Sequence, residues 1–314
     1  MSHKLGTVVI GGGTGFIGSI LWNQLMRKGY NIVVVSRRPG PYCITWGDLA
    51  RDGLPNGTTA VVSLSGQNIL DPARRWTPGF QQTVWASRVN TTSSLAQAII
   101  DSKEKPEVFV SASGVGYYPP SPTAEYTEDS VGGKDDYFAK LCKEWEEAAK
   151  LPEDLGVRQV IVRIGVVLGR HGGMIERLYW PFFFGLGGPI GSGNQYFPWI
   201  HIDDIARLFV FAIQNNKVSG VLNGVAPDIV TNREFAKTFG RALWRPAVIP
   251  LPAFVVETMF GKERAVMMLQ GQKVIPKRTQ ELGFMYKYPD IYSALKECSR
   301  LIYTPELMTK YRQP

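Results

Sequence analysis

Cysteine and histidine are scarce in this sequence, which has three residues of each among 314. The cysteines are too few and too widely separated for a disulfide framework, and the histidines show no zinc-ligand spacing. We therefore expect no metal ion in the site and a reducing, intracellular compartment. The residues concerned are Cys43, Cys142, Cys298, His3, His171 and His201.

Long apolar runs are also absent. No stretch of 18 consecutive apolar residues occurs, and no apolar signal region precedes the first predicted strand. We expect a soluble, cytoplasmic protein that does not contact a membrane. An organelle is the alternative location, although no amphipathic presequence is visible.

The chain is basic but has no block of like charge. Its formal charge is +8 and its pI is about 9.3, which favours anionic ligands. The basic residues are scattered, and no basic stretch is interleaved with aromatics, so we expect no nucleic-acid partner. A phosphate-bearing cofactor accounts for the excess, except for the basic stretches at 241–245 and 310–312.

Glycine is abundant, with 33 residues, and its main cluster follows an apolar run at 7–10. Gly12, Gly15 and Gly18 are three residues apart, and an apolar-periodic segment follows them. The pattern predicts a strand, a tight turn and a helix whose N-terminus binds a pyrophosphate. An ordinary strand-to-helix turn is the alternative reading. The cofactor segment comprises Gly12, Thr14, Gly15, Phe16, Ile17 and Gly18.

A second β-branched run, at 32–35, ends in Ser36, Arg37 and Arg38. At this position an acidic residue would accept hydrogen bonds from a ribose 2′-hydroxyl. A hydroxyl and two guanidinium groups instead suit a 2′-phosphate. The sequence therefore favours NADP(H) over NAD(H), and a solvated surface pair of arginines is the alternative.

Strand and helix patterns alternate over the first two-thirds of the chain. This predicts an α/β fold, a Rossmann-like doubly wound parallel sheet with a smaller C-terminal substrate lobe. Further strands are expected at 44–46, 60–66, 107–113, 160–163 (running on to 169) and 218–225. Helices are expected at 80–100, 135–150 and 232–244, and after a cap at Asp203 or Asp204. The expected units are a cofactor domain at 1–169 completed by 199–225, a lobe at 170–198 and 226–300, and a tail at 301–314.

The carboxyl ends of parallel strands carry the ligand in such sheets. Leu64, Ser65 and Gly66 end one predicted strand and are expected to form a wall of the cofactor site. Arg163 ends another. It either binds substrate or pairs with an acidic side chain.

Several motifs together resemble the extended short-chain dehydrogenase/reductases. They resemble most the atypical branch called epimerase family proteins, which has a C-terminal domain of unknown function. The motifs lie at 12–18, 64–68, 74–76, 87–88, 113–117, 185–193, 199–204, 222–227 and 271–276. The resemblance implies that Arg88 and Val166 contact the cofactor.

The resemblance also implies a catalytic arrangement from which this chain departs. In the wider family a Ser, here Ser113, hydrogen-bonds the substrate oxygen, and a Tyr four residues before a Lys is the general acid/base. Members commonly carry a Glu four residues after that lysine. Counting back from Glu146 places Cys142 at the lysine position and Phe138 at the tyrosine position. Neither residue can perform the role.

Tyr117 is the predicted substitute catalytic residue, with Tyr118 beside it. The alternative is that a tyrosine here only contacts substrate or packs. His201 is another candidate for the catalytic acid. The alternative is that His201 is only a hydrogen-bonded histidine near a helix cap.

Two functions follow from these patterns. The first is an NADP(H)-dependent oxidoreductase or epimerase-like enzyme for a small hydroxyl- or carbonyl-bearing substrate. The second is an NADP(H)-binding sensor with little or no catalysis, suggested by Phe138 and Cys142. A strict sugar-nucleotide epimerase fits least, because it needs the missing tyrosine. A homodimer is possible, since the relatives often pair through helices after the fourth and fifth strands.

Overall fold

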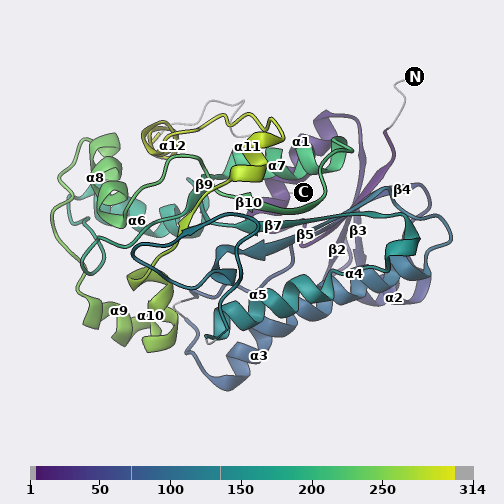
Figure 1. The fold of residues 1–314 in the computed structure, drawn as a ribbon, viewed down its shortest axis with the longest axis horizontal. Coiled ribbons are helices and arrows are strands. Elements are labelled where there is room, and N and C mark those ends of the chain that lie inside the picture. The colour runs from purple at the N-terminus through teal and green to yellow at the C-terminus, as the bar shows by residue number, and fades with distance from the viewer. Residues whose placement is uncertain (1–4, 72, 135, 301–314) are drawn as a thin grey trace.

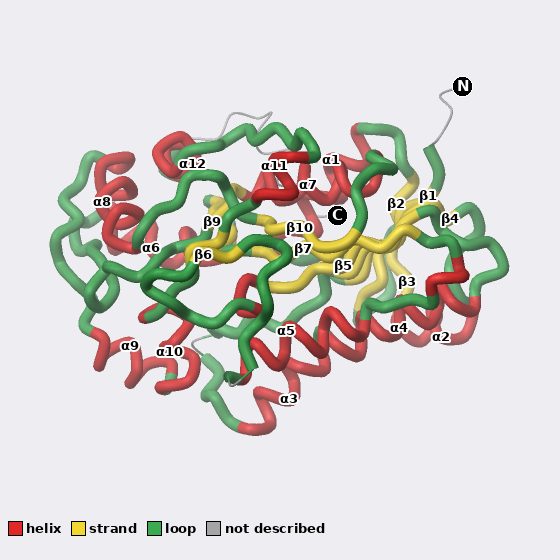
Figure 2. The backbone as a smooth tube through the Cα atoms, in the orientation of Figure 1, coloured by secondary structure: helices red, strands yellow, loops and turns green. Residues whose placement is uncertain are grey.

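A seven-stranded, wholly parallel sheet forms the centre of the computed structural model, which describes residues 5–71, 73–134 and 136–300. The strand order is β10-β7-β5-β4-β1-β2-β3 (Figures 1 and 2). The strands are β1 (Thr7–Gly11), β2 (Asn31–Ser36), β3 (Cys43–Thr45), β4 (Thr58–Ser63), β5 (Val108–Gly114), β7 (Arg158–Ile164) and β10 (Gly220–Gly224). The predicted α/β class and parallel sheet are confirmed.

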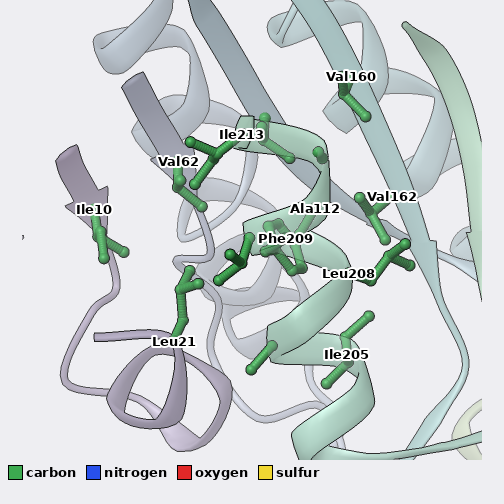
Figure 3. Packing of buried hydrophobic residues seen from close by; sticks show 14 of the residues in the cluster. Ile10, Leu21, Val62, Ala112, Val160, Val162, Ile205, Leu208, Phe209 and Ile213 are labelled. Carbon is green, nitrogen blue, oxygen red and sulfur yellow. The ribbon is translucent and has the colours of Figure 1, made fainter. Parts of the chain in front are cut away.

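Helices cover both faces of the sheet (Figure 1). One face carries α1 (Phe16–Arg27) and α7 (Ile202–Gln214), and the other carries α2 (Trp46–Asp52), α4 (Val89–Asp101) and α5 (Tyr137–Ala148), with α3 (Pro78–Ala86) outside them. Because both faces are covered, the strands are almost continuously apolar and buried. The apolar cluster between the sheet and these two helices, α1 and α7, is called the first core. Figure 3 shows it, with Ile205, Leu208 and Phe209 of α7 packed against side chains of the sheet and of α1.

The smaller lobe, whose helices are seen in Figure 2, has its own apolar core. Its helices are α6 (Gly173–Phe183), α8 (Asn232–Leu243), α9 (Ala253–Phe260), α10 (Lys262–Leu269), α11 (Lys277–Glu281) and α12 (Ile291–Cys298). Two small parallel sheets join it to the first unit, β8 (Val166–Gly169) with β9 (Trp199–His201) and β6 (Glu125–Tyr126) with β11 (Lys273–Val274). Short 3₁₀ turns, η1 (Val115–Tyr117) and η2 (Glu153–Leu155), complete the elements.

Some predicted boundaries are wrong. The helix expected at 80–100 is two helices, because α3 ends with Ser87 as its C-cap and α4 begins with Arg88 as its N-cap. The strand expected to run from 160 to 169 divides at Gly165, where a Cβ would lie 2.6 Å from the Pro198 carbonyl oxygen. The chain therefore turns out of the main sheet there. Trp46 does not end a strand but begins α2, which a Thr45 capping box stabilises.

The cap of α7 is also not the predicted one. His201 is the N-cap, and its Nδ1 accepts a hydrogen bond from the Asp203 amide at 3.1 Å. Asp204, one residue further into the helix, instead accepts from the backbone amides of Lys287 and Tyr288. Its carboxylate fastens the C-terminal segment onto the helix. Asp135, the expected start of another helix, and the tail 301–314 lie outside the described residues.

Candidate functional site

The turn between β1 and α1 has the geometry of a phosphate cradle. Gly12 has φ +80°, and a Cβ there would lie 2.7 Å from the Ser65 amide nitrogen. A Cβ on Gly18 would lie 2.4 Å from the Gly12 carbonyl oxygen. Glycine is thus required by close backbone approach at both positions. Gly15 caps α1 without a side-chain hydrogen bond, which leaves the helix N-terminus available to an anion.

This cradle lies at the point where the strand order reverses. β1 pairs with β2 on one side and with β4 on the other, so the carboxyl ends of these strands form the switch point at which such sheets bind ligands, called the crevice below. The structure brings the predicted Leu64, Ser65 and Gly66 to the same crevice. Phe16, at the start of α1, packs its ring against the backbone of Gly172, where a Cβ would lie 2.4 Å from the ring. Ile17 packs on the first core, and Thr14 is exposed.

The β2 side of the crevice carries the predicted ribose selector. Ser36 ends β2, and its hydroxyl donates to the Arg38 carbonyl oxygen. Arg37 and Arg38 are exposed, and no carboxylate in the described ranges forms an ion pair with either. Two unpaired guanidinium groups at this position fit a 2′-phosphate.

Arg88 enters the crevice from the β4 side. Its guanidinium carbon lies 3.1 Å from where a Cβ of Gly66 would be and 5.3 Å from the Trp145 ring centroid. Its Nη1 donates to the Val84 carbonyl oxygen at 3.1 Å. Burial lowers the pKa of the guanidinium to about 10. Val166 begins β8, just after the bend at Gly165.

Ser113, on β5, is held by a carboxylate. Its Oγ donates to Oε1 of Glu146 at 2.8 Å, and the residue is 2% exposed. Glu146 also pairs with Arg163, accepting from Nε at 2.8 Å and from Nη2 at 2.9 Å. Ser113 and Arg163 are register partners on neighbouring strands, so both side chains reach the same carboxylate on α5.

Arg163 therefore pairs with an acid, one of the two alternatives that its sequence position left open. Burial opposes its charge, but the hydrogen bonds and the charge of Glu146 raise its pKa above the ordinary value. This ion pair fixes the position of the Glu146 carboxylate behind Ser113.

Phe138 and Cys142 occupy the face of α5 where a Tyr-Lys pair would stand. Phe138 is buried and stacks on Trp76, with ring centroids 5.9 Å apart. The Cys142 Sγ lies 3.5 Å from the position of a Gly114 Cβ, and burial raises the pKa of the thiol to about 12. Neither side chain transfers a proton near neutral pH.

Tyr117 and Tyr118 lie in quite different surroundings. Tyr118 is fully buried, and its hydroxyl accepts from Arg163 and lies 2.8 Å from Oδ1 of Asn223. It is thus a core residue and no substitute for the missing tyrosine. Tyr117 is partly exposed, and the Arg163 guanidinium carbon lies 3.4 Å from its ring centroid. His201, 1% exposed, is the satisfied capping histidine.

Glu128 is a buried carboxylate whose role the sequence analysis missed. Glu128 accepts from the Asn223 amide at 3.2 Å and from the Arg278 amide at 3.1 Å. Asn223 also donates to the Ile275 carbonyl oxygen at 3.0 Å. These bonds fasten the C-terminal domain to the loop that follows Tyr117. No local sequence pattern predicts the hydrogen bonds of Glu128. For Glu146, the sequence offered only the four-residue spacing from Cys142 that the family resemblance uses.

The crevice, the glycine cradle and the serine on β5 define a nucleotide-binding protein of the short-chain dehydrogenase/reductase type. Residues 8–223 match the model of the NAD dependent epimerase/dehydratase family, and residues 251–298 match a domain of unknown function, DUF1731. The chain belongs to this epimerase family.

Individual relatives match this chain over nearly its whole length. The chain is 54% identical to the epimerase family protein SDR39U1 of Bos taurus over 291 residues, which cover 92% of this chain and 98% of the relative. The Arabidopsis thaliana chloroplastic homologue is 39% identical, covering 92% and 86%. A crystal structure of human SDR39U1 isoform 2 with NADPH has 53% identity and a TM-score of 0.92, covering 94% of this chain and all of the other.

The residues that the structure describes include neither a membrane-spanning helix nor a metal-ligand cluster. Across 5–71, 73–134 and 136–300, no helix has the length and apolar character to cross a bilayer. In the same ranges no group of three or more His, Cys, Asp or Glu side chains is arranged to hold a metal ion.

Proposed function

We propose that this protein is an NADP(H)-dependent oxidoreductase or epimerase-like enzyme of the short-chain dehydrogenase class. Its substrate is a small molecule with a hydroxyl or carbonyl group. The cofactor assignment draws on the cradle, on Arg37 and Arg38, and on the NADPH bound by the human relative. The observation that carries the catalytic proposal is the hydrogen bond from Ser113 to Glu146.

Ser113 presents its oxygen to a substrate in a defined state. Because its proton points to Glu146, the Oγ lone pairs are free to accept a hydrogen bond from a substrate hydroxyl. A proton leaving that hydroxyl is taken up by Ser113 as the serine proton passes to Oε1 of Glu146. Arg163 holds this carboxylate in position before the transfer. The bound nicotinamide supplies hydride chemistry, and the chain supplies binding, orientation and the proton path.

A second function is favoured by Phe138 and Cys142. With an aromatic stack and a neutral thiol on α5, the usual proton donor is absent. A protein of this kind can bind NADP(H) and report the nucleotide to a partner without turnover. The two functions differ in whether the bound dinucleotide is ever oxidised or reduced.

A carbonyl and alcohol screen tests the proposal. The protein is incubated with NADPH or NADP⁺ and a substrate panel, and the absorbance of the reduced nicotinamide is followed. We expect turnover that Ser113→Ala abolishes. Ser111→Ala is the matched control, because Ser111 is also buried on β5 and its Oγ donates to the Ala112 carbonyl oxygen. Silence across the panel, with NADPH binding shown by calorimetry, would favour the sensor.

We also propose a location and an assembly for the protein. We place the protein in the cytoplasm because all three cysteines are free thiols. A homodimer through α4 and α5 stays a prediction, to be checked by light scattering. The outward residues of these helices are polar, so such an interface would be hydrophilic; they include Asn90, Ser93, Gln97, Lys140 and Glu147.

A further inference from the structure

Arg88 is a cation placed at the inner end of the crevice. It stands at the junction of α3 and α4, where the predicted single helix is broken. Its guanidinium lies against Gly66 at the end of β4 and near Trp145 of α5. Cys142, which the resemblance places at the lysine position, lies close enough that its thiolate form would raise the pKa of Arg88. The site thus receives its positive charge from α4 instead of α5.

The charge of Arg88 is not neutralised locally. Arg163, the other cation of the region, is bound by both oxygens of Glu146. Arg88 has a carbonyl oxygen and the Ser87 hydroxyl as its hydrogen-bond acceptors, and no carboxylate of the described chain forms an ion pair with it. Although burial lowers its pKa to about 10, the group is charged at neutral pH. The inner end of the crevice therefore carries one net positive charge.

The strand order indicates which half of a dinucleotide lies near that charge. The exposed Arg37 and Arg38 follow β2, on one side of the cradle, and suit the 2′-phosphate of the adenosine half. The nicotinamide half consequently extends to the other side, over β4 and β5, where Gly66 and Ser113 lie. Arg88 lies on this second side.

We propose that Arg88 makes this site select the reduced dinucleotide, NADPH, over NADP⁺. The oxidised nicotinamide ring carries a positive charge, which a desolvated and uncompensated guanidinium repels. The reduced ring is neutral and is not repelled, while the hydroxyls of its ribose accept hydrogen bonds from Arg88. This inference rests on the proposed cofactor but on no catalytic step. Whether the protein is an enzyme or a sensor, it would bind the reduced cofactor in preference to the oxidised one.

Binding measurements without any substrate test it. Dissociation constants are measured by calorimetry for NADPH, NADP⁺ and 2′,5′-ADP, which has the 2′-phosphate but no nicotinamide. We expect the wild type to bind NADPH at least about fivefold more tightly than NADP⁺, because like charges repel strongly in a partly buried site. In Arg88→Met the ratio falls to near one, and in Arg88→Lys it is retained.

The controls separate this inference from the cofactor assignment. Arg88→Met leaves 2′,5′-ADP binding unchanged, whereas Arg38→Met weakens all three ligands by a similar factor and preserves the ratio. Equal affinity of the wild type for NADPH and NADP⁺ overturns the inference, even if Arg88→Met does not fold. An unchanged ratio in a folded Arg88→Met also overturns it. Failure of the wild type to bind 2′,5′-ADP would instead overturn the assignment of NADP(H).

Discussion

Ser113 and Arg163 face each other in register on β5 and β7 and share one carboxylate, that of Glu146 on α5. The serine hydroxyl and the guanidinium Nε each lie 2.8 Å from the same oxygen, Oε1. Two neighbouring strands and the helix that covers them are thereby joined beside the cofactor crevice. The same contact holds the catalytic candidate in one orientation.

Removing the shared carboxylate should destabilise the fold. In Glu146→Ala the guanidinium of Arg163, 3% exposed, is left without an anion. We expect the free energy of unfolding to fall by about 3–5 kcal/mol, measured by urea denaturation. Glu147→Ala is the control, because Glu147 forms only an exposed pair with Lys150, and it should change stability by no more than about 0.5 kcal/mol. Similar losses in the two variants would show that the buried pair is not a structural joint.

A methyl group on the cradle should impair nucleotide binding. Gly12→Ala forces an L side chain into a positive φ and toward the Ser65 amide. We expect NADPH affinity to fall at least about tenfold, measured by calorimetry, because the cradle backbone must shift. Gly79→Ala is the matched control. A Cβ there meets nothing within 4 Å and lies in helix α3, so binding should be unaltered.

Selection of the 2′-phosphate should depend on the arginines after β2. In Arg37→Met/Arg38→Met we expect NADPH affinity to fall about ten- to a hundredfold, the usual worth of charge-assisted hydrogen bonds, with NADH affinity unchanged. Parallel titrations with the two dinucleotides measure this. Arg51→Met should affect neither, since Arg51 is exposed on α2 and paired with Asp48 and Asp52. An equal loss for NADH would mean that the arginines do not read the phosphate.

Cys142 should make stability depend on alkaline pH. Its folded pKa, about 12, is above the ordinary thiol value of 9.0 because the group is buried. Below the ordinary value the thiol is protonated in both states and has no effect. Above it, the unfolded chain loses the proton while the folded chain keeps it, so stability falls by up to about 1.4 kcal/mol per pH unit.

The comparison that isolates this contribution is between the wild type and Cys142→Ala. Their difference in unfolding free energy should be constant below about pH 8 and should shrink above about pH 9, since alanine does not titrate. Alkylation gives an independent check: Cys43, partly exposed, should react before Cys142 in the native protein. Rapid modification of Cys142 at neutral pH would contradict the burial of its thiol.

Local patterns in the sequence were sufficient for part of this protein. The glycine spacing at 12–18 and the β-branched runs predicted the parallel sheet and its cradle, because strand, turn and helix signals are contained within a few residues. Such features depend on residue type and short spacing alone. The absence of a Tyr-Lys pair is different, because only the family resemblance implies that Phe138 and Cys142 stand where that pair is expected.

Tertiary structure decided the rest. Tyr117 and Tyr118 are adjacent and chemically identical, yet one is partly exposed on Arg163 and the other is in the core. Glu128 meets Asn223 across 95 residues and Arg278 across 150. A carboxylate is placed in such a position by the packing of distant elements, and no local periodicity records which partners will satisfy it.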